Sequence, residues 1–273
     1  AYTIPTGYKK LTTANLPTPT IKKPSDHFNT VLYTSNATNG KTVTGVGFSP
    51  NLFWAARRNA SGASSQMYDT VRGVGKGLDV AYANATEVAD GVTSFDADGV
   101  TLGATWPNAS NGDSWVAWNW KESATAGFDI VAYTGTGSAT TVSHSLGVAP
   151  ELIVVKNLTD GASVPVSISG LIGTGSDTLY WGNKNSAASS QTSVFPATLP
   201  TSSVFSVGTH AESNASSKDY IAYCFTPVAG YSRFGTYVGT GQSSGNQGVF
   251  VYTGFKPAFI SVSYTHLTLP TKA

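Results

Sequence analysis

The sequence predicts an all-β fold made of tandem antiparallel β-sandwich-like domains of about 100 residues, with a third copy that is truncated. Three observations predict it. Charged residues form only 11% of the 273-residue chain, and Gly, Ser, Thr and Asn take their place. Short apolar runs alternate with turn-forming residues throughout the chain. One long pattern of strands and turns begins three times.

Residues 1–26, "AYTIPTGYKKLTTANLPTPTIKKPSD", precede the repeated pattern. They are rich in proline, which favours extended chain over packed structure. We therefore expect the closing strand of a preceding domain, followed by a linker. Because the chain starts at Ala1 without Met, we also expect it to be a fragment of a longer protein.

The repeated pattern runs from an apolar strand ending in Tyr, through a polar turn, to Gly-x-x-Pro and a second apolar strand. The prolines Pro50, Pro150 and Pro257 lie 100 and 107 residues apart, which indicates an array of domains rather than a short-period solenoid. We expect repeats at residues 27–124 and 125–231 and a truncated third copy at 232–261. The matching tyrosines are Tyr33, Tyr133 and Tyr237.

The first two copies also end alike, with "DSWVAWNWK" and "KDYIAYCFTP". Both endings are apolar on both strand faces, as expected of a central strand that is covered on each side. One face carries Val116, Trp118 and Trp120 in the first copy and Ile221, Tyr223 and Phe225 in the second. Because these aromatic side chains recur at matching positions, we expect Trp118 and Tyr223 to be buried in the core at equivalent sites.

Within the first copy, "VTSFDADGVTLG" predicts a hairpin that turns at Asp98-Gly99. The glycines of "SSQMYDTVRGVGKGLDVAY" argue against a stable helix there. The second copy has no equivalent of Asp69-x-x-Arg72-Gly73, so any role of Arg72 belongs to one copy alone.

The overall composition excludes several classes of function. The net charge is +1 and no basic cluster is visible, which disfavours nucleic acid and anionic membrane surfaces as partners. No apolar run approaches the ~20 residues of a transmembrane helix. Cys224 is the only cysteine, so no disulfide within the chain can form, and we expect it to be a small buried apolar side chain.

The residues suggest no catalytic, cofactor-binding or metal-binding site, and we expect a protein that is not an enzyme. His144 and His210 are isolated, and Asp96–Gly99 resembles only the start of a calcium loop, better explained by the hairpin. No Gly-x-Ser-x-Gly nucleophile motif occurs, and no pair of carboxylates has a distinctive context. Trp54, Trp106 and Trp181 lack aromatic counterparts in the other copies and are candidates for an exposed binding surface. Six Asn-x-Ser/Thr sequences, attributed to chance composition, lie at Asn36, Asn59, Asn84, Asn108, Asn157 and Asn214.

Several stretches in a fixed order resemble a β-domain common in tail and tail-fibre proteins of marine bacteriophages. They include "PTGYKKLTTANLP", "GFSPNLFWAARRN", "YDTVRG", "FDADGVTLG" and "SWVAWNWK", followed by "YIAYCF" and "FVYTGFKPAFI", and they span about residues 5 to 260. In such proteins the "AYTIPTGYK" stretch often follows a SPRY-type sandwich.

The resemblance implies a structural and adhesive component of a phage virion, located in the tail and extracellular on release. The partners that it implies are other virion and tail proteins and a host-surface glycan, with a homo-oligomer as a further arrangement. The alternative is an extracellular glycan-binding or depolymerase accessory module, which the Trp and Tyr content favours.

The last twelve residues, 262–273, differ from the rest of the chain. "VSYTHLTLPTKA" resembles a translated sequencing adaptor, and the alternative is an unrelated natural tail. On the adaptor interpretation these residues have no native role, and His266 is no candidate ligand.

Overall fold

The computed structural model describes residues 19–59, 65–79, 91–160, 192–235, 237–239 and 249–262, together with the backbone of 166–169, 177–180 and 189–190. The described residues form strands and one 3-10 helix, η2 (Pro24–Asp26), so the predicted all-β class is confirmed. No helix among them is long and apolar enough to cross a membrane. The strands of the first unit are β1 (Phe28–Thr34), β2 (Lys41–Val43), β3 (Leu52–Arg57), β4 (Gln66–Asp69), β5 (Leu78–Asp79), β6 (Val92–Asp96), β7 (Gly99–Leu102) and β8 (Ser114–Trp120). Those of the second unit are β9 (Phe128–Thr134), β10 (Thr140–Ser143), β11 (Leu152–Asn157), β12 (Val166–Ser169), β13 (Asp177–Tyr180), β14 (Ser189–Ser190), β15 (Val204–Val207) and β16 (Asp219–Phe225).

Each unit is a large sheet packed on a small one. In the first unit the large sheet has the order β1-β8-β3-β4-β5 and the small sheet β2-β7-β6. In the second unit the large sheet is β14-β13-β12-β11-β16-β9 and the small sheet β10-β15. All of these strands pair antiparallel, and one hydrophobic core lies between the two sheets of each unit.

The closing strand is central in both units, as its two apolar faces predicted. β8 lies between β1 and β3, and β16 lies between β9 and β11. The repeated tyrosines occupy matching registers, since Tyr33 is opposite Trp115 and Tyr133 is opposite Tyr220. Both tyrosines stack on their partners, with interplanar angles of 13° and 12°.

Asn108 and Asn214 are equivalent buried clamps. Neither is exposed, and each side-chain oxygen accepts the backbone N–H of the turn after β1 or β9, from Asn36 at 2.8 Å and from Thr136 at 2.7 Å. Each side-chain nitrogen donates to two backbone carbonyls. These two asparagines were attributed to chance in the sequence. The tripeptide Asn-Ala-Ser, repeated before each closing strand, was the signal for their structural role.

The predicted hairpin forms between β6 and β7, with Asp96 opposite Gly99. The two turn residues are 97 and 98, one position earlier than predicted. Gly99 has φ +135°, and a Cβ there would collide with the carbonyl of Val43, so only glycine fits. The Asp98 carboxylate accepts the backbone N–H groups of Gly47 at 2.5 Å and Gly45 at 3.1 Å, and these bonds hold its pKa below the ordinary value.

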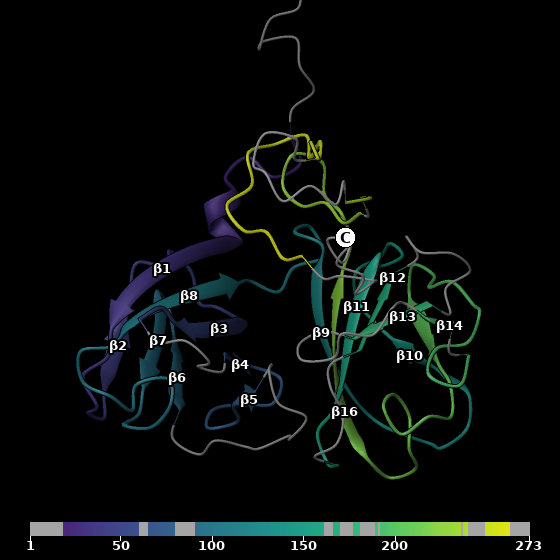
Figure 1. Ribbon diagram of the computed structural model, residues 1–273, viewed down its shortest axis with the longest axis horizontal. Coiled ribbons are helices and arrows are strands. Elements are labelled where there is room, and N and C mark those ends of the chain that lie inside the picture. Colours follow the sequence, from purple (N-terminus) through teal and green to yellow (C-terminus); the bar gives the residue numbers. More distant parts are fainter. Residues whose placement is uncertain are drawn as a thin grey trace, which may run out of the picture.

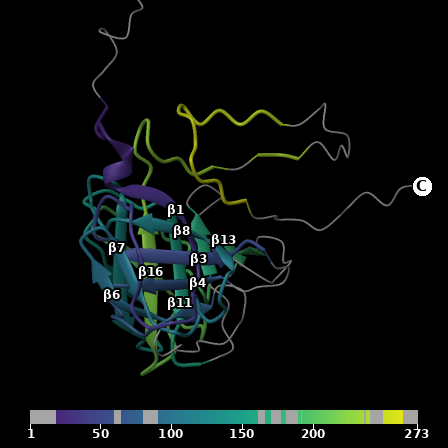
Figure 2. The same ribbon diagram turned by 90° about the vertical axis from the view of Figure 1, so that its left-hand side faces the viewer.

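The two large sheets face each other and form a third core between the units. Its buried members come from both units and include Leu52, Trp54 and Met67 from the first and Ile130, Val154, Ile221 and Tyr223 from the second. The strands of one large sheet cross those of the other, as Figures 1 and 2 show. The molecule therefore has four layers of sheet and three cores.

The third core corrects two expectations about tryptophan. Trp54, a candidate for an exposed surface, is 9% exposed and belongs to this core, because the second unit covers the outer face of β3. Trp118, expected to be as buried as Tyr223, is only half-buried, because it lies at the margin of the interface. Trp106 is half-buried and packs on Trp115 at 4.7 Å between ring centroids. Trp181 lies outside the described residues.

The described part of the third copy extends along the end of the molecule where η2 lies (Figures 1 and 2). Phe234 contacts Phe225 of the second unit, at 6.0 Å between ring centroids. Phe259 contacts the first unit instead. The third copy therefore docks on both units.

Candidate functional site

Three polar side chains meet in the apolar interface between the units. Arg72 follows β4 in the first unit, and its Nε donates to Asp69 Oδ2 at 2.5 Å. The hydroxyl of Tyr223, on β16 of the second unit, donates to the same Asp69 oxygen at 2.7 Å. An Arg72 Nη2–H points at the Tyr223 hydroxyl at 3.4 Å. We call Asp69, Arg72 and Tyr223 the junction triad.

A tight turn after β4 positions the two charged members of the triad. The backbone N–H of Arg72 donates to Asp69 Oδ1 at 2.8 Å, and that of Gly73 donates to the Asp69 carbonyl at 3.1 Å. Gly73 has φ +88°, which glycine adopts without strain. The spacing Asp-x-x-Arg-Gly is thus the local requirement for aiming both side chains at the second unit. The motif needs to occur only once, because its partner is a tyrosine of the other copy.

The triad is buried and its hydrogen-bonding groups are engaged. The side chains of Arg72 and Asp69 are 6% and 0% exposed. Arg72 Nη1 donates to the Lys76 carbonyl at 2.7 Å, and Nη2 donates to the Met67 carbonyl at 3.0 Å. An ion pair this deep persists only when hydrogen bonds replace the lost water, as they do here.

Burial and neighbouring charges shift the pKa values of Tyr223 and Arg72. Burial raises the pKa of Tyr223 well above the ordinary value, so its hydroxyl stays protonated and donates. Burial opposes the charge of Arg72, but Tyr223 and Asp69 raise the pKa of its guanidinium above the ordinary value. The arrangement is therefore a buried ion pair beside a protonated tyrosine hydroxyl.

Two other titratable groups belong to the same interface. Burial, a hydrogen bond with Asp129 and the charges of Asp129 and Asp69 raise the pKa of Glu122 to about 7. Burial lowers the pKa of Lys156, on β11, to about 8, while the charge of Asp79, on β5, acts in the opposite direction. Neither residue stood out in the sequence, because both signals depend on contacts between the units.

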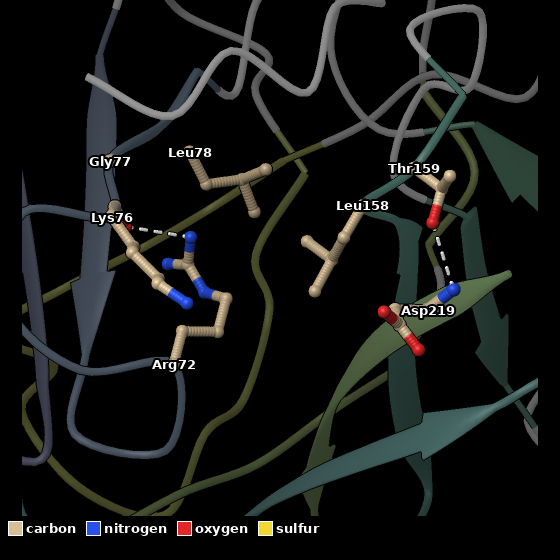
Figure 3. Close-up of a pocket in the computed structure, with 7 residues that line it drawn as sticks. All are labelled: Arg72, Lys76, Gly77, Leu78, Leu158, Thr159 and Asp219. Carbon is tan, nitrogen blue, oxygen red and sulfur yellow. Dashed lines mark hydrogen bonds between the residues drawn. The ribbon is translucent and has the colours of Figure 1, made fainter. Parts of the chain in front are cut away.

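A cavity of about 150 Å³ opens beside the triad. Figure 3 shows Leu78 of the first unit and Leu158 of the second projecting toward each other, with Arg72 and Lys76 on one side and Thr159 and Asp219 on the other. Its polar groups already have partners: Arg72 donates to the Lys76 carbonyl, and the Asp219 N–H donates to Thr159 Oγ1 at 2.9 Å. The cavity has room for a few water molecules and is not a site for a large ligand.

The other sequence candidates have local structural roles. His144 is 8% exposed; its Nδ1 accepts the N–H of Leu146, and its Nε2 lies 3.1 Å from the Thr201 carbonyl. His210 Nδ1 accepts the N–H of Glu212. Cys224 is buried, as predicted, and burial raises the pKa of its thiol. Within the part of the chain that the structure describes, no three His, Cys, Asp or Glu side chains gather as metal ligands would.

Asp96 is also occupied by its own hairpin. Its two carboxylate oxygens accept the hydroxyls of Ser94 and Thr101, both at 2.7 Å. This geometry fits the hairpin explanation of the Asp-Ala-Asp-Gly stretch.

The asparagines of the Asn-x-Ser/Thr sequences fall into three groups. Asn108, Asn157 and Asn214 are fully buried, so a glycan could not be attached without opening the fold. Asn36 and Asn59 are exposed. Asn84 lies outside the described residues.

Comparison with known proteins gives one match. Residues 23–269 match the family described as "Domain of unknown function (DUF7483)", a single family that spans both units and the described part of the third copy. No curated protein and no solved structure matches the chain.

Proposed function

The chain belongs to the DUF7483 family, and we propose that it is a structural and adhesive component of a phage virion, a tail-fibre-like array of repeats that contacts the host surface. It acts in the tail and is extracellular on release. Its partners are other tail proteins and a glycan on the host surface.

The observation that carries the proposal is the rigid joint between the units. Domains joined only by a linker have small, polar interfaces and move independently of each other. Here a hydrophobic core and the junction triad join the units, with Arg72 and Tyr223 coming from segments 151 residues apart. A rigid joint of this kind suits a fibre that must hold its tip at a fixed distance and bear load.

We propose in addition that the chain is not an enzyme. Among the described residues, Glu122 and Asp129 are the carboxyl pair that most resembles an acid–base pair, because the pKa of Glu122 is raised. They are hydrogen-bonded to each other, whereas glycoside hydrolysis needs carboxyl groups separated by about 5–9.5 Å so that the sugar fits between them.

Immunogold electron microscopy tests the virion assignment. Antibodies raised against this chain should label the tails of phage particles whose genome encodes it, and antibodies first absorbed with the purified chain serve as the control. Labelling of the capsid alone, or none on intact particles with the antigen present in the lysate, would refute the proposal.

The alternative is a glycan-binding or depolymerase accessory module. Trp118 and Trp120 favour it, because both are only half-buried. A glycan array probed with the full chain, combined with the virion labelling above, separates the two functions. Binding to defined sugars, combined with no labelling of virions, would support the module and exclude the tail component.

A further inference from the structure

Four aromatic side chains gather at one end of the large sheet of the first unit. Phe28 lies on β1, Trp54 on β3, and Trp118 and Trp120 on the central strand β8. The register places Phe28 opposite Trp120 and Trp54 opposite Trp118. Their ring centroids are 4.8 Å apart for the first pair and 5.1 Å for the second. We call these four residues the aromatic cluster.

Phe259 of the third copy packs against all four members. Its ring centroid lies 5.4 Å from Trp120, 5.5 Å from Trp118 and 5.9 Å from both Trp54 and Phe28. It meets the three indoles edge to face, at interplanar angles of 64° to 89°, an arrangement that aromatic pairs prefer.

Three other apolar side chains of the third copy are more exposed than Phe259. Ile260 is 70% exposed, Tyr252 69% and Phe250 86%. Phe259 is only partly exposed and is the member of its segment that joins the third core. Of the aromatic side chains in the described part of this segment, Phe259 is the one whose ring packs on the cluster.

The repeat pattern explains why this position reaches the core. Phe259 stands two residues after Pro257, as Leu52 and Leu152 stand two residues after Pro50 and Pro150. Leu52 is buried in the third core, and Leu152 packs against it. All three copies thus direct the same position of the repeat toward one shared core.

We propose that the aromatic cluster is the docking site for the third repeat, with Phe259 as its anchor, so that the repeats close around a shared core. In a linear array each repeat contacts only its neighbours. Here the third repeat contacts the second through Phe234 and also docks on the first through Phe259. The occupant is an aromatic side chain of the chain itself, because the edge-to-face geometry and the repeat position both select it.

Nuclear magnetic resonance of the tryptophan indole N–H groups in the full 273-residue chain tests the proposal. Phe259→Ala should shift the signals of Trp54, Trp118 and Trp120 several-fold more than Phe250→Ala, the control at a residue 86% exposed. Phe259→Leu, which introduces the residue type of the other two copies, should retain the fold and give smaller shifts. This variant keeps the test valid if Phe259→Ala does not fold.

A peptide that corresponds to residues 253–262, added to Phe259→Ala, should restore the native indole signals, and the same peptide with Ala at position 259 should not. Shifts for Phe259→Ala no larger than those for Phe250→Ala would overturn the proposal. It would also be overturned if the peptide had no effect while a soluble oligosaccharide moved the same signals, because the occupant would then be a sugar.

Discussion

Removing the guanidinium of the junction triad should destabilise the protein more than any other single change of charge in the described residues. Arg72→Met leaves the Asp69 carboxylate, 0% exposed, without its cation and removes four side-chain hydrogen bonds. Breaking a buried ion pair from one side costs about 3–5 kcal/mol. Asp69 keeps two partners, the Tyr223 hydroxyl and the Arg72 backbone N–H, so we expect the lower half of that range, about 3–4 kcal/mol.

Chemical denaturation at pH 7 measures this loss, and a matched control exists. The Arg57–Asp113 ion pair has side chains 23% and 18% exposed and lies away from the interface between the units. Arg57→Met should therefore cost less than Arg72→Met, because water reaches its ion pair. Asp69→Asn combined with Arg72→Met removes both charges and should be less destabilised than Arg72→Met alone.

The double variant also supplies the result that would refute the reasoning. If Arg72→Met stays within about 0.5 kcal/mol of the native chain, the pair is not buried as described. If the losses of unfolding free energy for Asp69→Asn alone and Arg72→Met alone sum to the loss for the double variant, the carboxylate and the guanidinium do not act as a pair.

Three further predictions concern other buried or partly buried side chains. Glu122 has a folded pKa of about 7, above its unfolded value, so its contribution to stability is fully present below pH ~4.5 and is lost as the pH rises toward 7. Over that pH range the unfolding free energy should fall by about 1 kcal/mol, after discounting for partial exposure. Glu122→Gln should remove this fall in a pH series of unfolding free energies. Asn108→Ala and Asn214→Ala should each cost about 2–4 kcal/mol in thermal or chemical unfolding, since each leaves buried backbone groups unpaired, and a loss below about 0.5 kcal/mol would contradict the clamp. Tyr223→Ala should cost about 3–5 kcal/mol and Trp118→Ala about half as much by the same measurement, because Trp118 is only half-buried; equal losses would contradict the difference in burial.

Local pattern alone was enough to predict the all-β class, the closing strands and one hairpin. Alternation of apolar residues predicted the central strands β8 and β16, and the recurring tyrosines predicted matching positions, which Tyr33 and Tyr133 occupy. The hairpin at Asp98 and Gly99 was predicted to within one residue. These features depend on neighbours along the chain, so the sequence contains them directly.

Which faces become interior was decided only by the tertiary structure. Trp54 was predicted to lie on the surface, but the second unit covers β3 and buries it. The role of Arg72 depends on its contact with Tyr223, 151 residues further along the chain. The raised pKa of Glu122 and the docking of Phe259 likewise arise between units. The physical reason is that a strand carries its own alternation, whereas burial and desolvation of its outer face depend on the sheet that packs against it.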